Sequence, residues 1–361
     1  MSFSKEDTKV VKGIAICLML YHHLFAYPHK ILEGIGFVSL YSFGETTLST
    51  YIGQFGRICM PMFLFMSGYG TYLSSQKTGD ITSLAAKRIK GLYTAVWQVF
   101  FLSLPVSVYF FRNMQTGLLR EIIYNSLGLS CTFNEEWWFI LPFAVLIVLF
   151  PSIKRFLDRE KANVFTDLFI ILIYSAFCNY IVPVIMERPA LEYFAASVFW
   201  HKTREVLEIL PAFLLGCIFA KYALLDRVKE KYAGKTVWCI AALVCMAAVF
   251  YLHLYNHLFY DFINSAVFIC CIAVLLPLRV FKPLFRLLGK LGDESAFIWL
   301  THTFFSAYWC QKLIFAPKYS ALIFLLLLAV SYCAAKLIRL FWALAGRIAK
   351  REEKTVPAGN K

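Results

Sequence analysis

Two histidines near the end of an apolar N-terminal segment are the first residues whose chemistry needs an explanation. The stretch KGIAICLMLYHHLF, residues 12–25, is apolar enough to enter a membrane, yet it begins with Lys12 and carries His22 and His23 near its far end. A helix that only anchors a protein has no need of imidazoles there. An imidazole changes its charge near neutral pH, with a pKa of about 6.5, and an ionisable group within a membrane segment is by default a candidate for function.

Lys12 and His23 share one face of the predicted helix. Eleven residues at about 100° each make three turns plus about 20°, and separate the two side chains by roughly 16 Å along the axis. His22 is rotated off this line. An ionisable group at that depth is costly and usually faces a cavity or a partner, so we expect His23 to be functional and His22 to be structural. The alternatives are a neutral His23 hydrogen-bonded to a neighbouring helix, and a Lys12 that only anchors the cytoplasmic border.

Charged residues lie at both borders of the next two apolar segments. Arg57 enters the second segment from outside, and a buried arginine must pair with an acid, a carbonyl or an anionic ligand. Ser67 lies near the inner end of that segment. The stretch AAKRIKGLY on the cytoplasmic side carries a basic cluster: Lys87, Arg88 and Lys90. Such a cluster either fixes topology or binds the phosphates of a nucleotide-like ligand. Four glycines in the second segment suit close helix packing: Gly53, Gly56, Gly68 and Gly70.

Two later stretches add candidate residues. FNEEWWFILPF, residues 133–143, places Glu136 and Trp137 at the outer end of the fourth apolar segment. Tryptophans are expected at a membrane interface, and they also stack on sugar rings. SAFIWLTHTFF, residues 295–305, places His302 inside the ninth segment, where it too needs a partner.

The elements that must position these residues are membrane helices. The 361 residues are 60% hydrophobic and only 16% charged, whereas soluble domains average about 25% charged. We predict an all-α, polytopic membrane helix bundle with about ten transmembrane helices. The predicted spans are roughly 10–26, 53–73, 92–111, 137–152, 164–183, 208–222, 236–254, 262–278, 294–311 and 319–345. We expect one transmembrane domain over residues 1–350 and a polar cytoplasmic tail over 351–361.

Charge and cysteine distribution exclude several other classes. The net charge of +14 is concentrated in alternate connections, which predicts that both termini are cytoplasmic and that the charge reflects topology and membrane lipids, with no nucleic-acid partner. The eleven cysteines are scattered, and no Cys or His spacing suits a metal. We therefore expect no metal site and no disulfide framework.

Taken together, these stretches resemble the acyltransferase 3 family of bacterial integral membrane O-acyltransferases. That family opens with a basic residue, ten intervening residues and a histidine, a spacing that Lys12 and His23 keep. PMFLFMSGYG and KRIKGLY are similar to its next two motifs, and WWFILPF, LPAFLLGCIFAK and SAFIWLTH to later ones. The likeness covers about residues 12–305. One departure is Leu141-Pro142, where some members carry a Glu shortly after the Trp of the fourth span.

The resemblance implies a stand-alone transferase in the bacterial cell membrane. It would move an acyl group, by similarity acetyl, from cytoplasmic acyl-CoA to a hydroxyl of a surface glycan or lipid-linked sugar. No cofactor would be bound permanently, because acyl-CoA is a co-substrate. His23 would be catalytic, as a general base or as an acyl carrier, and we favour the base. The expected donor contacts are Lys12, Ser67, Lys87, Arg88 and Lys90. The expected acceptor contacts are Arg57, Glu136, Trp137 and His302. The alternative function is a multispan transporter or flippase for a glycan precursor or another anionic solute.

Overall fold

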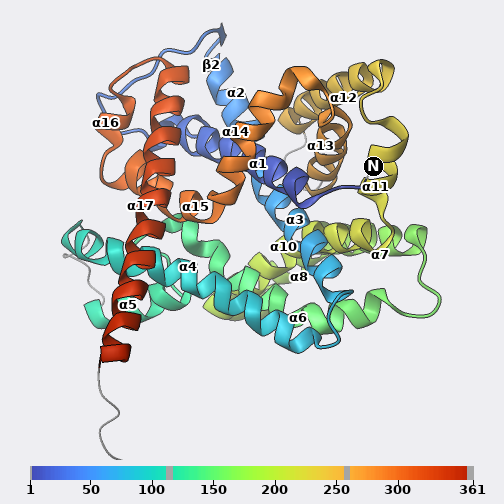
Figure 1. Ribbon diagram of the computed structural model, residues 1–361, viewed down its shortest axis with the longest axis horizontal. Helices are drawn as coiled ribbons and strands as arrows, with labels where there is room; N and C mark the ends of the chain where they lie inside the picture. Colours follow the sequence, from blue (N-terminus) through green and yellow to red (C-terminus); the bar gives the residue numbers. More distant parts are fainter. Residues whose placement is uncertain (1, 111–116, 256–260, 356–361) are drawn as a thin grey trace, which may run out of the picture.

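The computed structural model describes residues 2–110, 117–255 and 261–355, and its regular structure is almost entirely helical (Figure 1). This confirms the all-α prediction. Part of the predicted polar tail, residues 356–361, lies outside the described ranges.

The N-terminal half of the fold comprises α1 (Lys5–Phe25), α2 (Leu48–Phe55), α3 (Cys59–Ser75), α4 (Ile81–Phe110), α5 (Leu118–Leu127), α6 (Ile140–Leu157), α7 (Val164–Ala176) and α8 (Val182–Met186). The remainder comprises α9 (Glu192–Ala195), α10 (Val198–Lys221), α11 (Leu224–Tyr232), α12 (Thr236–Tyr255), α13 (Asp261–Leu275), α14 (Lys282–Asp293), α15 (Ser295–Thr303), α16 (Gln311–Phe315) and α17 (Ser320–Thr355). Two short strands, β1 (Ser42–Phe43) and β2 (Thr46–Thr47), form an antiparallel hairpin in the connection before α2.

Within the residues that the structure describes, five helical stretches are long and apolar enough to cross a membrane, or up to seven if each of two bent helix pairs is one span. Three of the five lie within single helices, namely α4, α12 and α17. The other two are Glu135–Leu157, which consists of the turn η3 (Glu135–Phe139) and α6, and Val164–Met186, which runs from α7 to α8. The bent pairs are α10–α11, at 64°, and α13–α14, at 103°. About ten spans were expected from the sequence. Three of the expected spans that are missing are α1, α3 and α15. Lysines and histidines lower the mean hydropathy of α1, whereas α3, with 17 residues, and α15, with 9, are too short. These polar or short helices carry four of the ten predicted site residues: Lys12, His23, Ser67 and His302.

Two helix pairs approach so closely that only glycine fits between them. In the α3–α10 pair, a Cβ at Gly68 would lie 2.0 Å from the carbonyl oxygen of Phe213, and one at Gly216 would lie 2.0 Å from that of Phe65. Small residues allow this close backbone contact between membrane helices. The α1–α14 pair meets in the same way, through one glycine on each helix: Gly13 and Gly292. These contacts fix α1 and α3, which carry the predicted donor residues Lys12 and Ser67.

The contact between α1 and α2 depends on two of the predicted glycines. A Cβ at Gly53 would lie 2.7 Å from the nitrogen of Ala26, and one at Gly56 would lie 2.4 Å from the carbonyl oxygen of Leu18. Gly70 differs, because a Cβ there would meet nothing within 4 Å. The predicted close packing therefore holds for Gly53, Gly56 and Gly68. The tight contact also places the break between α2 and α3 beside the histidine end of α1.

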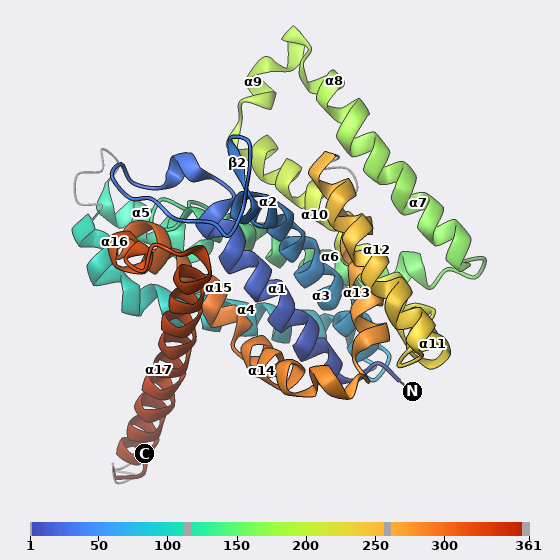
Figure 2. The same cartoon turned by 90° about the horizontal axis from the view of Figure 1, so that it is seen from above.

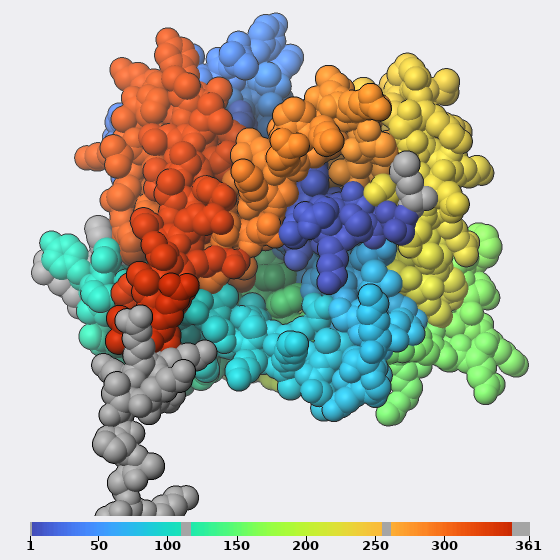
Figure 3. Space-filling model, viewed as in Figure 1, coloured from blue at the N-terminus to red at the C-terminus, as the bar shows by residue number. Residues whose placement is uncertain are grey.

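The start of α1 and the end of α17 lie on the same side of the bundle, away from β2, α8 and α9 (Figure 2). Figure 3 views the face that carries the start of α1, and it shows a hollow bordered by α1, α4 and the α14–α15 stretch. This hollow is an opening through which a molecule on that side could reach the interior.

Which side of the membrane this face occupies is a prediction from the basic residues, which place it in the cytoplasm. Leu119 of α5 and Glu160, which follows α6, are both exposed. We expect Leu119→Cys to react with a membrane-impermeant thiol reagent applied to intact cells, and Glu160→Cys to react only after permeabilisation. The parent protein, with its native cysteines, is the control. The reverse labelling pattern would place the hollow outside the cell and exclude a cytoplasmic donor.

Candidate active site

His23 meets a carboxylate and a second histidine inside the bundle. Its Nδ1 lies 3.4 Å from Oε1 of Glu136, and its ring centroid lies 4.9 Å from that of His302. The three residues come from α1, from the turn η3 (Glu135–Phe139) before α6, and from α15. The side chains of His23 and Glu136 remain 17% and 23% exposed. The cluster is therefore enclosed but can still be reached by a small group.

Local structure around η3 sets the position of Glu136. Asn134 caps this turn, and its Oδ1 accepts hydrogen bonds from the Glu136 backbone N–H at 3.1 Å and from Oγ1 of Thr303 at 3.0 Å. Trp137 follows and is fully buried, with its indole N–H donating to the carbonyl oxygen of Leu300 at 3.1 Å. Both contacts tie η3 to α15. Glu136 and His302 are thus held together by packing between these two elements.

The burial of Trp137 bears on its predicted contact with the acceptor. None of its side chain is exposed, and its ring packs against Phe100 and Phe304 at centroid distances of 6.1 and 5.7 Å. A ring enclosed in this way has no free face on which a sugar could stack. The structure therefore favours a structural role for Trp137 rather than a place at the outer mouth.

His302 presents one nitrogen that has no hydrogen-bond partner among the residues that the structure describes. Its Nδ1 lies 2.8 Å from the carbonyl oxygen of Trp299 and 3.1 Å from that of Ile298. A carbonyl only accepts hydrogen bonds, so Nδ1 carries the hydrogen and Nε2 keeps a lone pair. Nε2 is buried and has no hydrogen-bond partner in the described part of the chain. A hydroxyl group arriving in the cluster could donate to it.

Two further buried polar atoms lie on the elements that carry Glu136 and His302. Oδ1 of Asn134 must face the Glu136 N–H, so the amide nitrogen Nδ2 points elsewhere, and it has no partner among the described residues. The same holds for Oγ of Ser306, four residues after His302 in the π-helical turn η7 (Phe304–Tyr308). Buried polar groups normally find partners, and those left unpaired often mark a ligand site. Neither residue was predicted, because a single Asn or Ser in an apolar sequence carries no signal.

His22 and Arg57 make contacts that hold the helices together, although the His22 ring also lies 5.1 Å from the ring of His23. Nδ1 of His22 lies 2.8 Å from the carbonyl oxygen of Gly53. Nε of Arg57 lies 3.3 Å from Oδ2 of Asp261, and Oδ1 of the same carboxylate lies 3.0 Å from Nδ1 of His253. The acid partner that Arg57 requires is therefore Asp261. The side chain of Arg57 remains 35% exposed, which leaves part of the guanidinium open to a ligand.

The predicted donor residues divide into an inward and an outward set. Nη2 of Arg88 donates to the carbonyl oxygen of Gly70 at 3.0 Å and to Oγ of Ser74 at 3.3 Å. Lys12 is half-buried, and the charge of Arg88 acts on it. Neither cation forms an ion pair with any residue that the structure describes. Lys87 and Lys90 are exposed, whereas Ser67 is half-buried on α3 beside Gly68.

A comparison with known families shows what kind of protein contains this arrangement. A family model described as an acyltransferase domain matches residues 7–339, a range that includes the whole histidine cluster. The chain belongs to the acyltransferase 3 family. No curated protein and no solved structure gives a significant match.

The geometry of this acyltransferase suits proton transfer. Among the residues that the structure describes, no group of three or more His, Cys, Asp or Glu is arranged to hold a metal ion. A carboxylate beside one imidazole nitrogen fixes the tautomer and orientation of the ring, and stabilises the imidazolium that forms when the other nitrogen takes a proton. His23 and Glu136 of the acyltransferase have this relation.

Proposed function

We propose that this acyltransferase moves an acyl group, most simply acetyl, from cytoplasmic acyl-CoA to a hydroxyl of a cell-surface sugar or glycan precursor. The observation that supports this most strongly is the His23–Glu136–His302 cluster, which lies within the helix bundle and has one imidazole paired with a carboxylate. Membership of the family supports acyl transfer as the reaction class. The bacterial cell membrane is the location that fits a cytoplasmic donor and an acceptor at the outer face.

His23 acts as the general base in this proposal. Glu136, whose Oε1 lies 3.4 Å from Nδ1, would keep the hydrogen on that nitrogen, and Nε2 would then take the proton of the acceptor hydroxyl. The hydroxyl oxygen then bonds to the acyl carbon, and the carbon–sulfur bond of the thioester breaks. The departing CoA thiolate takes up the proton that His23 received. A covalent acyl-histidine is not required for this sequence.

The donor reaches the cluster from the face that bears the hollow. Lys12 of α1 and Arg88 of α4 belong to two of the helices that border it, and neither forms an ion pair with a described carboxylate, although the charge of Asp293 acts on Lys12. Phosphates of CoA would supply a negative charge to pair with them. Ser67 lies on α3, the helix that supplies two oxygen partners of Arg88. The exposed Lys87 and Lys90 would assist only at longer range.

The acceptor hydroxyl is bound on the side of η3 and α15. Nε2 of His302 would accept its hydrogen bond, and Nδ2 of Asn134 would donate to another oxygen of the sugar or of the acyl group. Arg57, with part of its guanidinium open, would contact the acceptor further out. Glu136 contributes to this side through His23 rather than as a separate contact at the mouth.

The inward position of Arg88 leads to a prediction about donor affinity. We expect Arg88→Gln to weaken acetyl-CoA binding to the detergent-purified protein about 10- to 100-fold, since charge-assisted hydrogen bonds contribute about 1.5–3 kcal/mol each. Lys87→Gln, one residue earlier and exposed, is the matched control and should change affinity less than threefold. Unchanged acetyl-CoA affinity in both variants, measured by titration, would reduce the basic cluster to a topology signal.

The proposed acceptor class is tested in cells. Surface glycans from a strain that produces the protein should carry base-labile acyl groups, detected as a mass difference that mild alkali removes. A strain that lacks the gene should lose them, and a gene copy encoding His23→Ala should not restore them. Glycans with the same acyl content in all strains would exclude this class of acceptor.

A further inference from the structure

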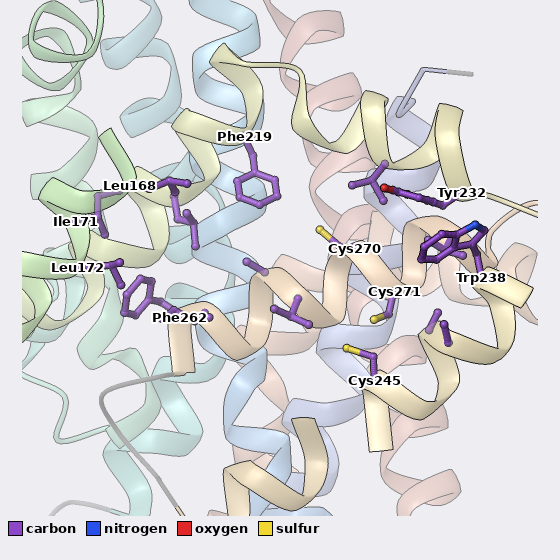
Figure 4. Close-up of a pocket in the computed structure, with 18 residues that line it drawn as sticks. Leu168, Ile171, Leu172, Phe219, Tyr232, Trp238, Cys245, Phe262, Cys270 and Cys271 are labelled. Atoms are coloured by element: carbon purple, nitrogen blue, oxygen red, sulfur yellow. The ribbon is translucent and has the colours of Figure 1, made fainter. Parts of the chain in front are cut away.

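A large apolar cavity that shares no lining residue with the histidine cluster lies between α7, α10, α11, α12 and α13 (Figure 4). Its volume is about 530 Å³, and its lining is almost entirely hydrocarbon and sulfur. In Figure 4, Leu172 and Phe262 stand at one end and Tyr232 and Trp238 at the other. Water inside such a cavity would find few hydrogen-bond partners, so an apolar occupant is favoured.

The cavity has the depth of one membrane leaflet. Its lining on α13 runs from Phe262 to Val274, and the twelve residue-to-residue steps between them cover about 18 Å of helix. Half of a hydrocarbon core of about 30 Å is about 15 Å. Two of the surrounding helices, α7 and α12, belong to candidate membrane spans. Only 11% of the span that contains α7 is buried within the protein, so its surface is left for other molecules.

The aromatic end of the cavity is also its charged end. Tyr232 and Trp238 lie 4.3 Å apart between ring centroids, the kind of pair that is common at a membrane interface. Nζ of Lys231 lies 5.2 Å from the Tyr232 ring, and Lys235 donates to the carbonyl oxygen of Lys231. Lys231, Lys235 and nearby Arg227 are exposed, and none forms an ion pair with any described residue.

We propose that this cavity binds an anionic phospholipid, with an acyl chain between α7 and α13 and its headgroup phosphate beside Lys231 and Lys235. The apolar lining matches the chain, the length matches one leaflet, and the cationic end matches the headgroup. Positive residues near a membrane surface attract anionic lipids with about 1 kcal/mol each. The lipid fills the space between α7 and its neighbours, and so holds the outer edge of the bundle in place.

Quenching of Trp238 by a lipid with brominated chains tests this proposal. The detergent-purified full chain is titrated with brominated phosphatidylglycerol or brominated phosphatidylcholine, and tryptophan fluorescence is followed. We expect saturable quenching by phosphatidylglycerol at lower concentration than by phosphatidylcholine. Trp238→Phe should remove the saturable component, because the other tryptophans do not line the cavity. Non-saturable quenching, equal for the two lipids, would overturn the proposal and indicate only general lipid contact.

Two variants separate the headgroup from the chain. Lys231→Gln combined with Lys235→Gln should raise the phosphatidylglycerol concentration for half-quenching about 10- to 30-fold and leave that for phosphatidylcholine unchanged. Ala242→Phe, which fills the cavity, should abolish saturable quenching by both. Melting of each variant without lipid shows whether it is folded. A folded double-lysine variant with unchanged affinity would refute the headgroup contact, and quenching that survives in folded Ala242→Phe would refute the chain site.

Discussion

His23→Ala should lose nearly all acyl transfer while the protein still binds acyl-CoA. A general base typically contributes 10²–10⁴-fold to a rate, or roughly 3–5 kcal/mol of activation free energy. The ring of His23 lies beside Glu136 and His302. The proposed phosphate contacts are elsewhere, because Lys12 lies eleven residues earlier on α1 and Arg88 lies on α4. We therefore expect the turnover number to fall by about 10²–10⁴-fold with the dissociation constant for acetyl-CoA within about twofold of the parent value.

His22→Ala is the matched control for this experiment. His22 is the neighbouring residue on the same helix. Its ring lies 5.1 Å from that of His23, but its Nδ1 contacts the backbone carbonyl of Gly53 and no ion pair joins it to Glu136 in the described part of the chain. Its loss should lower the melting temperature more than the turnover number. If His22→Ala were inactive and His23→Ala active, the helical-face assignment would be wrong and His22 would be the base. Full activity in both variants would remove the proposed general base altogether.

Glu136→Gln should produce the second large loss, of about 10²-fold or more in turnover number. Glutamine keeps the shape of the side chain but removes the charge that stabilises the His23 imidazolium, and its amide can present a donor instead of an acceptor to Nδ1. Because Glu136 acts through His23, the Michaelis constants for donor and acceptor should change by less than about threefold. Steady-state rates with each substrate varied in turn measure this separation.

The neighbouring Glu135 provides the control for Glu136. Its side chain is 73% exposed and lies 3.8 Å from Nζ of Lys30, so it belongs to a surface pair. Surface pairs contribute about 0–1 kcal/mol to stability, so Glu135→Gln should be nearly as active as the parent protein. A Glu136→Gln variant that differs from the parent only in acceptor Michaelis constant would show a direct acceptor contact, as first inferred from the sequence, and would contradict its role as the partner of His23.

The sequence predicted the parts of the fold that depend on local composition. Apolar runs identified most helices, and the glycine positions identified the close contacts at Gly53, Gly56 and Gly68. About ten spans were expected, but the lengths and compositions of the helices support fewer. One reason is that breaks interrupt the helices: a π-helical turn follows α15, and the α13–α14 pair is bent by 103°. Such breaks arise from packing between helices, which single-sequence periodicity does not record.

The site was predicted residue by residue but not as an arrangement. The Lys12–His23 spacing indicated the functional imidazole, and the cost of burying His302 indicated that it needs a partner. Nothing in the sequence indicated that Glu136 and His302 would meet His23, since the three are joined only by the packing of η3 and α15 against α1. Interfacial chemistry suggested an exposed Trp137, but the structure buries this side chain by fixing it to α15.

The most direct measurement of the central claim follows the acyl group itself. The purified protein in liposomes is supplied with acetyl-CoA labelled in the acetyl group and with a surface glycan fraction. The account predicts alkali-labile label on the glycan and release of free CoA in equal amounts, with neither product formed by His23→Ala. Unlabelled glycan and intact acetyl-CoA in the presence of folded protein, together with movement of the glycan across the bilayer, would contradict acyl transfer and identify a transporter.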